Sequence, residues 1–171
     1  MVQVSLDTSF LISFADPDRP NHAVAVDYFR RCLSQRIPMW ISTVAAGEFA
    51  VGQPITDLPL QNFRIQPYNL PHAIRAAALY RSLRGENAPA PDDRRPIIIN
   101  DLKIIAQAAE DQIPFILTED AGTLSRLVTR LRQQDIISVR ILLLAEGFTP
   151  GRLENPDQGE LTLPHIRPVE L

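Results

Sequence analysis

Apolar and polar residues alternate in several short stretches of this 171-residue chain. Val2, Val4 and Leu6 alternate with polar neighbours, which is the period of a β-strand. Short apolar runs that follow turn residues indicate further strands, at residues 37–42, 114–118 and 136–144. Residues 63–67 are either a short strand or an irregular segment.

Between these stretches the apolar residues recur at helical spacing, which predicts amphipathic helices. Asn21 is placed to cap a helix that ends near Leu33, and we expect that helix to bury Ala23, Val24, Val26 and Phe29. Asn100 is placed to cap a later helix with Asp101 in its first turn, where a negative charge suits the helix dipole. The other predicted helices cover residues 10–14, 44–51, 71–85 and 124–131.

Strands and helices alternate from the start of the chain to residue 145. This order predicts an α/β fold with a central parallel sheet and helices on both faces. The stretch from Gly85 to Pro96 contains three prolines and five charged residues, so we interpret it as an exposed loop. Residues 1–145 then form one domain, and residues 146–171 form a C-terminal extension that is not an independent domain.

Composition, net charge and cysteine count disfavour some classes of function. Hydrophobic residues make up 45% of the chain and charged residues 22%, with a formal net charge of -3. A protein that binds nucleic acid over a broad electrostatic surface is usually basic, so that class is disfavoured. The single cysteine, Cys32, excludes an intrachain disulfide, and we expect a cytoplasmic location with no membrane association and no signal peptide.

Four acidic residues stand where a parallel sheet of this kind forms its sites. Asp7 and Asp120 directly follow predicted strands, whereas Glu48 and Asp101 lie near the starts of helices. The carboxyl ends of parallel strands and the starts of the following helices share one edge of the sheet. The four carboxylates could therefore meet there, although each acid alone could equally be a turn former or a helix cap.

Glu48 is the hardest of the four to explain structurally, because its helix neighbours are almost all apolar. A carboxylate in such surroundings is rarely buried without a partner. Carboxylate oxygens are hard ligands that suit Mg²⁺ or Mn²⁺. Such ions can lower the pKa of a water molecule, align it with a phosphodiester and neutralise the leaving oxygen.

The segments that contain these acids resemble the PIN-domain family. Residues 4–12 (VSLDTSFLI) are similar to its opening strand, first acid and following Thr/Ser. Residues 41–48, 100–109 (NDLKIIAQAA) and 115–120 (FILTED) are similar to its second, third and closing segments. The resemblance spans roughly residues 1–145 and rests on the order and spacing of the four motifs.

The resemblance implies a PIN-like fold, an acidic pocket that depends on Mg²⁺ or Mn²⁺, and endonucleolytic cleavage of RNA. Many bacterial members resemble VapC-type toxins, which implies a small antitoxin partner and a homodimer. Carried over by motif, the catalytic and metal-binding residues are Asp7, Glu48, Asp101 and Asp120. Thr8, Asn100 and Thr118 would support them by hydrogen bonding. Glu119 remains the alternative to Asp120 as the fourth acid.

Three basic residues near Asp101 leave two interpretations open. Arg94, Arg95 and Lys103 lie close in sequence to Asp101 and could contact RNA phosphates, or could form a solvated loop and helix face.

The acids also suggest other functions. A haloacid-dehalogenase-like phosphatase would need a second aspartate where Ser9 stands. A PIN nuclease outside the toxin group, or a catalytically silent PIN-like scaffold that binds RNA or protein, stays as the competing function.

Overall fold

Five parallel strands form the centre of the computed structural model, which describes residues 2–84 and 95–153. The strands are β1 (Val4–Leu6), β2 (Met39–Ser42), β3 (Arg64–Gln66), β4 (Phe115–Thr118) and β5 (Arg140–Leu143). Their order across the sheet is β3-β2-β1-β4-β5. The predicted strands are confirmed, although the last one is shorter than its apolar run.

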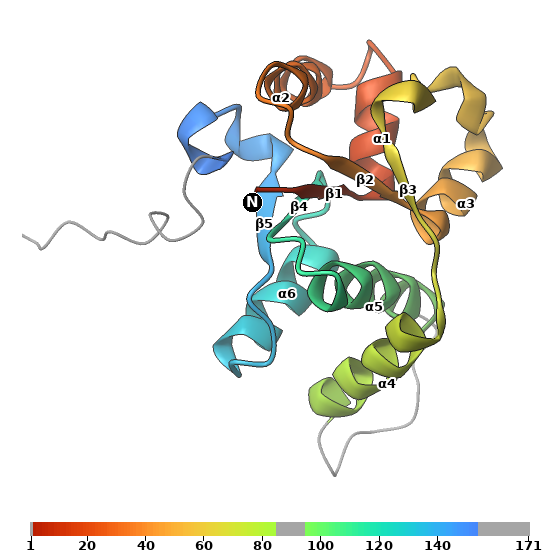
Figure 1. The fold of residues 1–171 in the computed structure, drawn as a ribbon, viewed down its shortest axis with the longest axis vertical. Helices are drawn as coiled ribbons and strands as arrows, with labels where there is room; N and C mark the ends of the chain where they lie inside the picture. The colour runs from red at the N-terminus through yellow and green to blue at the C-terminus, as the bar shows by residue number, and fades with distance from the viewer. Residues whose placement is uncertain (1, 85–94, 154–171) are drawn as a thin grey trace, which may run out of the picture.

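Helices cover both faces of this sheet, as the alternating pattern predicted (Figure 1). One layer contains α1 (Thr8–Ala15), α2 (His22–Ser34) and α3 (Thr43–Gly52). The other contains α4 (Leu70–Arg84), α5 (Arg95–Glu110) and α6 (Leu124–Gln133). Short 3₁₀ turns cover residues 55–57, 60–62, 144–146 and 150–153. Within the described part of the chain, no helix is both long and apolar enough to cross a membrane.

The strand order creates a switch point between β1 and β4. From β1 the chain adds β2 and then β3 on one side, whereas from β4 it adds β5 on the other side. The two central strands pair in parallel with Leu6 opposite Leu117, and both residues are fully buried. The chain leaves the two strands toward opposite faces, and in open parallel sheets ligands commonly bind beyond the carboxyl ends of strands at such a point. Asp7 and Asp120 follow these two strands.

The helix α5 begins earlier than the sequence pattern predicted. It starts at Arg95, so the apolar run 97–99 is helical, and neither Asn100 nor Asp101 lies in the first turn. The expected N-cap at Asn100 is therefore wrong. Proline is well tolerated in the first turn of a helix, so Pro96 does not delay its start. The side chain of Asn100 is consequently available for contacts outside its own helix.

The inward face of α2 also differs from the prediction. Ala25, Tyr28 and Cys32 are fully buried at i, i+3 and i+7, whereas Ala23 is exposed. The side chain of Asn21, at the N-cap position, makes no capping hydrogen bond. The aliphatic residues at the start of α2 were therefore a poorer guide to the buried face than its tyrosine and cysteine.

A buried polar network joins the sheet to the α4–α5 layer. Gln107 of α5 is fully buried; it accepts a hydrogen bond from Ser42 and donates one to the Gln66 carbonyl, over 2.5 and 3.1 Å. Gln66 also donates to Asp111, which contacts the buried His72 at 3.2 Å. Because buried polar groups are costly unless they are paired, these bonds hold α5 in one position against the strand ends.

Candidate functional site: carboxylates at the sheet switch point

Asp7 lies at the carboxyl end of β1 with only 5% of its surface exposed. Its Oδ2 accepts hydrogen bonds from the Ser9 hydroxyl at 2.7 Å and the Thr118 hydroxyl at 2.8 Å. Its side chain also caps α1 through the Ser9 backbone N–H. Burial raises the pKa of this carboxyl, and the hydrogen bonds oppose that shift without cancelling it.

Glu48, on α3, is held by residues from two other elements. The hydroxyl of Thr8 donates to its Oε2 over 2.5 Å, and the Asn100 amide donates to its Oε1 over 2.8 Å. Lys103, one turn along α5, donates to Asn100 Oδ1 over 3.1 Å. The unexpected helical start of α5 is what allows Asn100 to reach Glu48. The partner that an acid in an apolar helix requires is therefore present.

Asp101 is the least satisfied of the acids. Its Oδ2 is buried and has no hydrogen-bond partner. Burial, and after it the negative charges of Asp7, Asp120 and Glu48, together raise its pKa to about 7 from an ordinary 3.8. Like charges interact in this way only at short range, so the four carboxylates share one electrostatic environment. We call these four side chains the four-carboxylate group.

Asp120 follows β4 and organises the turn into α6. Its Oδ1 accepts from the backbone N–H groups of Gly122 and Thr123 at 2.7 and 2.8 Å, and its Oδ2 accepts from Leu124 at 3.1 Å. A side chain at Gly122 would approach Asp120 Oδ1 to 3.1 Å, so glycine permits this tight turn. The turn places the carboxylate beside the switch point.

Glu119 has different contacts from its neighbour Asp120. It accepts hydrogen bonds from the Ser13 hydroxyl, the Arg19 guanidinium and the Asn21 amide over 2.6–3.0 Å. Burial tends to raise its pKa, but these partners outweigh the burial and lower the pKa overall. Glu119 therefore connects the end of β4 to α1 and to the turn before α2. The charges that act on Asp101 include Asp120 and not Glu119.

Ser9 has a larger role than sequence analysis gave it. Its hydroxyl donates to Asp7, lies 2.9 Å from the Thr118 hydroxyl, and accepts from the backbone N–H of Glu119 at 2.8 Å. Its place two residues after the strand-end acid was the available signal. Of the residues predicted to support the acids or to contact RNA, Thr8, Asn100, Lys103 and Thr118 lie around the four-carboxylate group. Arg94 and the side chain of Arg95 lie outside the described residues.

The donor chemistry of the four-carboxylate group fits a hard divalent cation. All four side chains offer carboxylate oxygens, and the buried, unpartnered Oδ2 of Asp101 requires a cation or a proton. Among the residues that the structure describes, no three acidic, histidine or cysteine side chains already stand in a metal-ligating arrangement. Hydrogen-bond donors hold the oxygens of Glu48, Asp7 and Asp120 instead.

Comparison with known proteins identifies the family. The family model described as the PIN domain matches residues 4–128, which span β1 through the first half of α6. The chain belongs to the PIN-domain family. This confirms the resemblance seen in the four acidic motifs. No curated protein sequence matches the chain.

Solved structures share the PIN fold at low sequence identity. A DNA-bound VapBC2 complex from Rickettsia felis contains a chain with 13% identity and a TM-score of 0.56, covering 84% of this chain and 98% of that one. A DNA-bound VapBC from Salmonella typhimurium gives 18% identity and a TM-score of 0.52, covering 84% and 99%. At these identities the likeness establishes the fold.

The raised pKa of Asp101 predicts how the metal-free protein responds to pH. The folded-state pKa of about 7 lies above the ordinary value of 3.8, so between these values the native state binds more protons than the unfolded state. The resulting stabilisation is complete below about pH 4 and is lost as the pH rises through about 7. The Asp101→Asn variant lacks this titration. Its melting temperature should therefore rise relative to wild type across this window.

Melting curves recorded in EDTA at several pH values measure this difference. Asp57→Asn, a change at an exposed acid in the 3₁₀ turn after α3, is the matched control. It should keep a constant offset from wild type. If Asp101→Asn also keeps a constant offset between pH 4 and 8, Asp101 does not titrate in this range and the electrostatic description is wrong.

Proposed function

We propose that this PIN-domain protein is an endoribonuclease that hydrolyses RNA phosphodiester bonds at the four-carboxylate group with Mg²⁺ or Mn²⁺. The observation that carries the proposal is the buried Oδ2 of Asp101, which lacks a hydrogen-bond partner and lies in the field of three other carboxylates. A hard divalent cation would relieve both the unpaired oxygen and the repulsion. Family membership supports the same chemistry.

In this proposal Asp7, Glu48, Asp101 and Asp120 hold the cation. When bound, the cation supplies neutralisation of phosphate charge and a water of lowered pKa for attack on phosphorus. The surrounding hydroxyls keep the carboxylates in place: Ser9 and Thr118 orient Asp7, and Thr8 orients Glu48. Outer contacts of this kind commonly affect metal affinity or activity by about 10–100-fold.

Asn100 and Lys103 extend the group toward substrate. Asn100 orients Glu48, and Lys103 places an ammonium group next to Asn100. A lysine beside a carboxylate site can contact a phosphate that flanks the scissile bond. Arg94 and Arg95 are proposed to serve the same purpose. Thr8 and Thr118 are also proposed to assist substrate binding. They do so indirectly, by orienting the carboxylates of Glu48 and Asp7.

The alternative is a PIN-like scaffold that binds RNA or protein without cutting it. All four acids are present, and none of them is paired with a basic side chain that would neutralise it in the described structure. A scaffold would have no need for an unpartnered buried carboxylate oxygen, because replacement by a neutral residue would stabilise it. This favours the nuclease.

We also propose that the protein is the toxin of a toxin–antitoxin pair, with a small antitoxin partner and a homodimeric state. The structural neighbours are described as VapBC complexes, which supports such a partner. Large apolar side chains are exposed on α3, β3 and α4, where a partner would cover them: Val51, Ile65, Leu70 and Ile74. The remaining candidate in this class is a PIN nuclease without an antitoxin.

Metal-dependent cleavage is the central prediction. Wild type with Mg²⁺ or Mn²⁺ should cut a mixed single-stranded RNA panel, and EDTA should abolish cutting. Asp7→Asn and Asp101→Asn should lower the rate by at least about a hundredfold, because proposed metal ligands should matter at least as much as outer contacts. Asp57→Asn should cut like wild type. Matched DNA strands show whether the preference is for RNA.

Two results would contradict this proposal. Cutting that persists in EDTA or in Asp101→Asn would place the chemistry elsewhere. Tight RNA binding with no cutting under any metal would favour the scaffold. A metal-induced rise in melting temperature for wild type, absent in Asp101→Asn, would report metal binding even without a suitable RNA.

The contacts of Asp120 and Glu119 predict opposite outcomes for the two acids. Asp120→Asn keeps the shape of the side chain and one oxygen that can accept from Gly122 and Thr123, and it loses only the contact of the other oxygen with Leu124. It should therefore fold normally and lose cleavage. Glu119→Gln weakens the contacts to Ser13 and Arg19, so it should lower the melting temperature while metal-dependent kcat is retained. The reverse result would make Glu119 the fourth ligand.

The proposed homodimer predicts concentration-dependent association. Sedimentation of the purified chain should give about twice the monomer mass of 19.2 kDa, and Leu70→Lys should shift it toward monomer. Ser82→Lys, at an exposed position on the same helix, is the charge control. A wild-type monomer at every concentration would exclude the homodimer. Co-purification with the product of an adjacent gene tests the antitoxin separately.

A further inference from the structure

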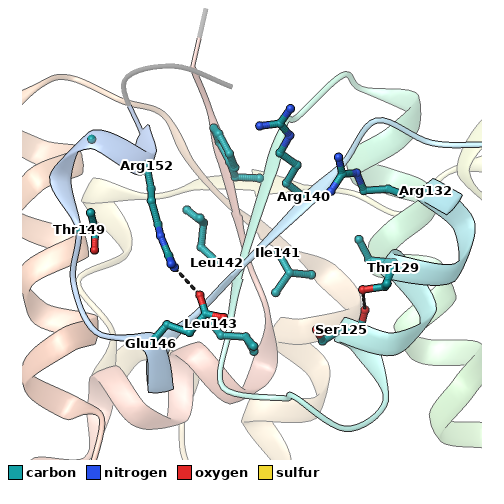
Figure 2. Close-up of a pocket in the computed structure, with 13 residues that line it drawn as sticks. Ser125, Thr129, Arg132, Arg140, Ile141, Leu142, Leu143, Glu146, Thr149 and Arg152 are labelled. Carbon is teal, nitrogen blue, oxygen red and sulfur yellow. Dashed lines mark hydrogen bonds and ion pairs between the residues drawn. The ribbon is translucent and has the colours of Figure 1, made fainter. Parts of the chain in front are cut away.

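A groove runs along the outer strand β5, on the far side of β4 from β1 (Figure 2). Its floor is β5, one wall is the face of α6 with Ser125, Thr129 and Arg132, and the other wall is the segment 146–152. The cavity has a volume of about 480 Å³. That is within the range of roughly 300–1,000 Å³ that holds small organic groups, so a nucleotide fits.

The groove is cationic although the chain is acidic. Arg132, Arg140 and Arg152 line it, and Glu146 is its only acidic lining residue among those described. Arg152 pairs with Glu146, whereas Arg132 and Arg140 lie near each other at one end of the view (Figure 2). Each guanidinium carries five N–H donors, so it can bind an anion in addition to an existing partner.

Two observations connect this groove to the four-carboxylate group. Ser125, at the start of the α6 wall, donates its backbone N–H to the carbonyl of Asp120. Leu143, at the end of the floor, pairs in register with Thr118, whose hydroxyl binds Asp7. Because a helix rises 1.5 Å per residue, Arg132 lies about 10 Å along α6 from Ser125. The groove therefore leads from the acids to the arginine pair.

The lining also has the mixed character that a polynucleotide requires. The hydroxyls of Ser125 and Thr129 and the guanidinium groups suit phosphate and ribose oxygens. The partly exposed side chains of Ile141 and Leu143 offer apolar surface to a base or sugar. A second cavity of about 630 Å³ shares Arg132 and Arg140 and adds Arg75 together with one acid, Asp135, so arginine side chains continue beyond the first groove.

We infer that the β5–α6 groove binds the single-stranded RNA that extends from the scissile bond, with Arg132 and Arg140 contacting its backbone phosphates. This inference rests on the proposed function, because it takes RNA to be the substrate of the four-carboxylate group. Binding of RNA to the groove can nevertheless be measured without cleavage. An acidic peptide is the competing occupant. Continuity with the acids through Asp120 and Thr118 favours RNA, because a peptide would gain nothing from that position.

The test compares Arg132→Gln, Arg140→Gln and the double variant with wild type. Arg81→Gln, an exposed arginine on α4 away from the groove, is the matched control. Fluorescence anisotropy in EDTA measures binding of a labelled single-stranded RNA of about ten nucleotides. Each single change should weaken the Kd about tenfold, and the double variant should flatten the plot of log K against log salt by about 1.4. Arg81→Gln should match wild type.

Cleavage adds a readout that a merely structural role would not change. On the same RNA the double variant should raise KM while kcat at saturation is retained, and on a dinucleotide it should behave like wild type. Equal melting temperatures of variant and control verify the fold. If wild type cuts nothing, the proposed function fails, and the binding series still supports or overturns the groove.

Three outcomes would overturn the inference. The double variant could bind RNA with the Kd and salt dependence of Arg81→Gln. It could lose dinucleotide cleavage as severely as long-RNA cleavage, which would place the arginines at the reacting bond. A peptide of consecutive glutamates could displace the RNA from wild type as effectively as unlabelled RNA of equal charge, which would make the groove a peptide site.

Discussion

Repulsion among carboxylates at the sheet switch point is the constraint to which the surrounding structure responds. Asp101 shows it most clearly, because burial and three neighbouring negative charges raise its pKa to about 7. A fold gains no stability from such an arrangement unless something else compensates it. Around the acids the chain supplies donors rather than counter-charges: the hydroxyls of Thr8, Ser9 and Thr118, the Asn100 amide and backbone N–H groups.

These donors come from every layer of the fold. Those on α1 and β4 bind Asp7, those on α1 and α5 bind Glu48, and the turn into α6 binds Asp120. Of the four acids, Asp101 is the one with a buried side-chain oxygen that has no hydrogen-bond partner in the described structure. The buried network around Gln107 fixes α5, and therefore Asp101, against the sheet. The position of the unpaired oxygen is thus a property of the packed core, which is what a site for a hard cation requires.

Negative and positive charges are concentrated at two different places on the sheet. The carboxyl edge at the switch point concentrates negative charge, whereas the β5–α6 groove presents three arginines. A polyanion that approached the acids alone would be repelled. The proposed cation would remove that repulsion at the reacting phosphate, and the arginines would attract the phosphates beyond it. The net charge of -3 conceals this division because it averages over the whole chain.

The family and the layered fold were accessible from sequence because they depend on local pattern. Period-two and helical spacing located the elements, and acids at strand ends marked the carboxyl edge without knowledge of any contact. The order of four short motifs then identified the PIN family, which the family comparison confirmed. The positions of Asp7 and Asp120 at this edge were predictable for this reason: Asp7 directly follows β1, and Asp120 lies two residues beyond the end of β4.

Only the tertiary structure decided the relations between distant residues. The start of α5 was misplaced because an apolar run such as residues 97–99 suits either a strand or a helix, and packing decides between them. That start determines that Asn100 binds Glu48, 52 residues away. The separate partners of Glu119 and Asp120, the bridging position of Ser9 and the basic groove beside β5 likewise depend on side chains brought together from several elements. Sequence pattern identified which residues carry charge, but folding determined which charges meet, because electrostatic and hydrogen-bond energies depend on distance in space.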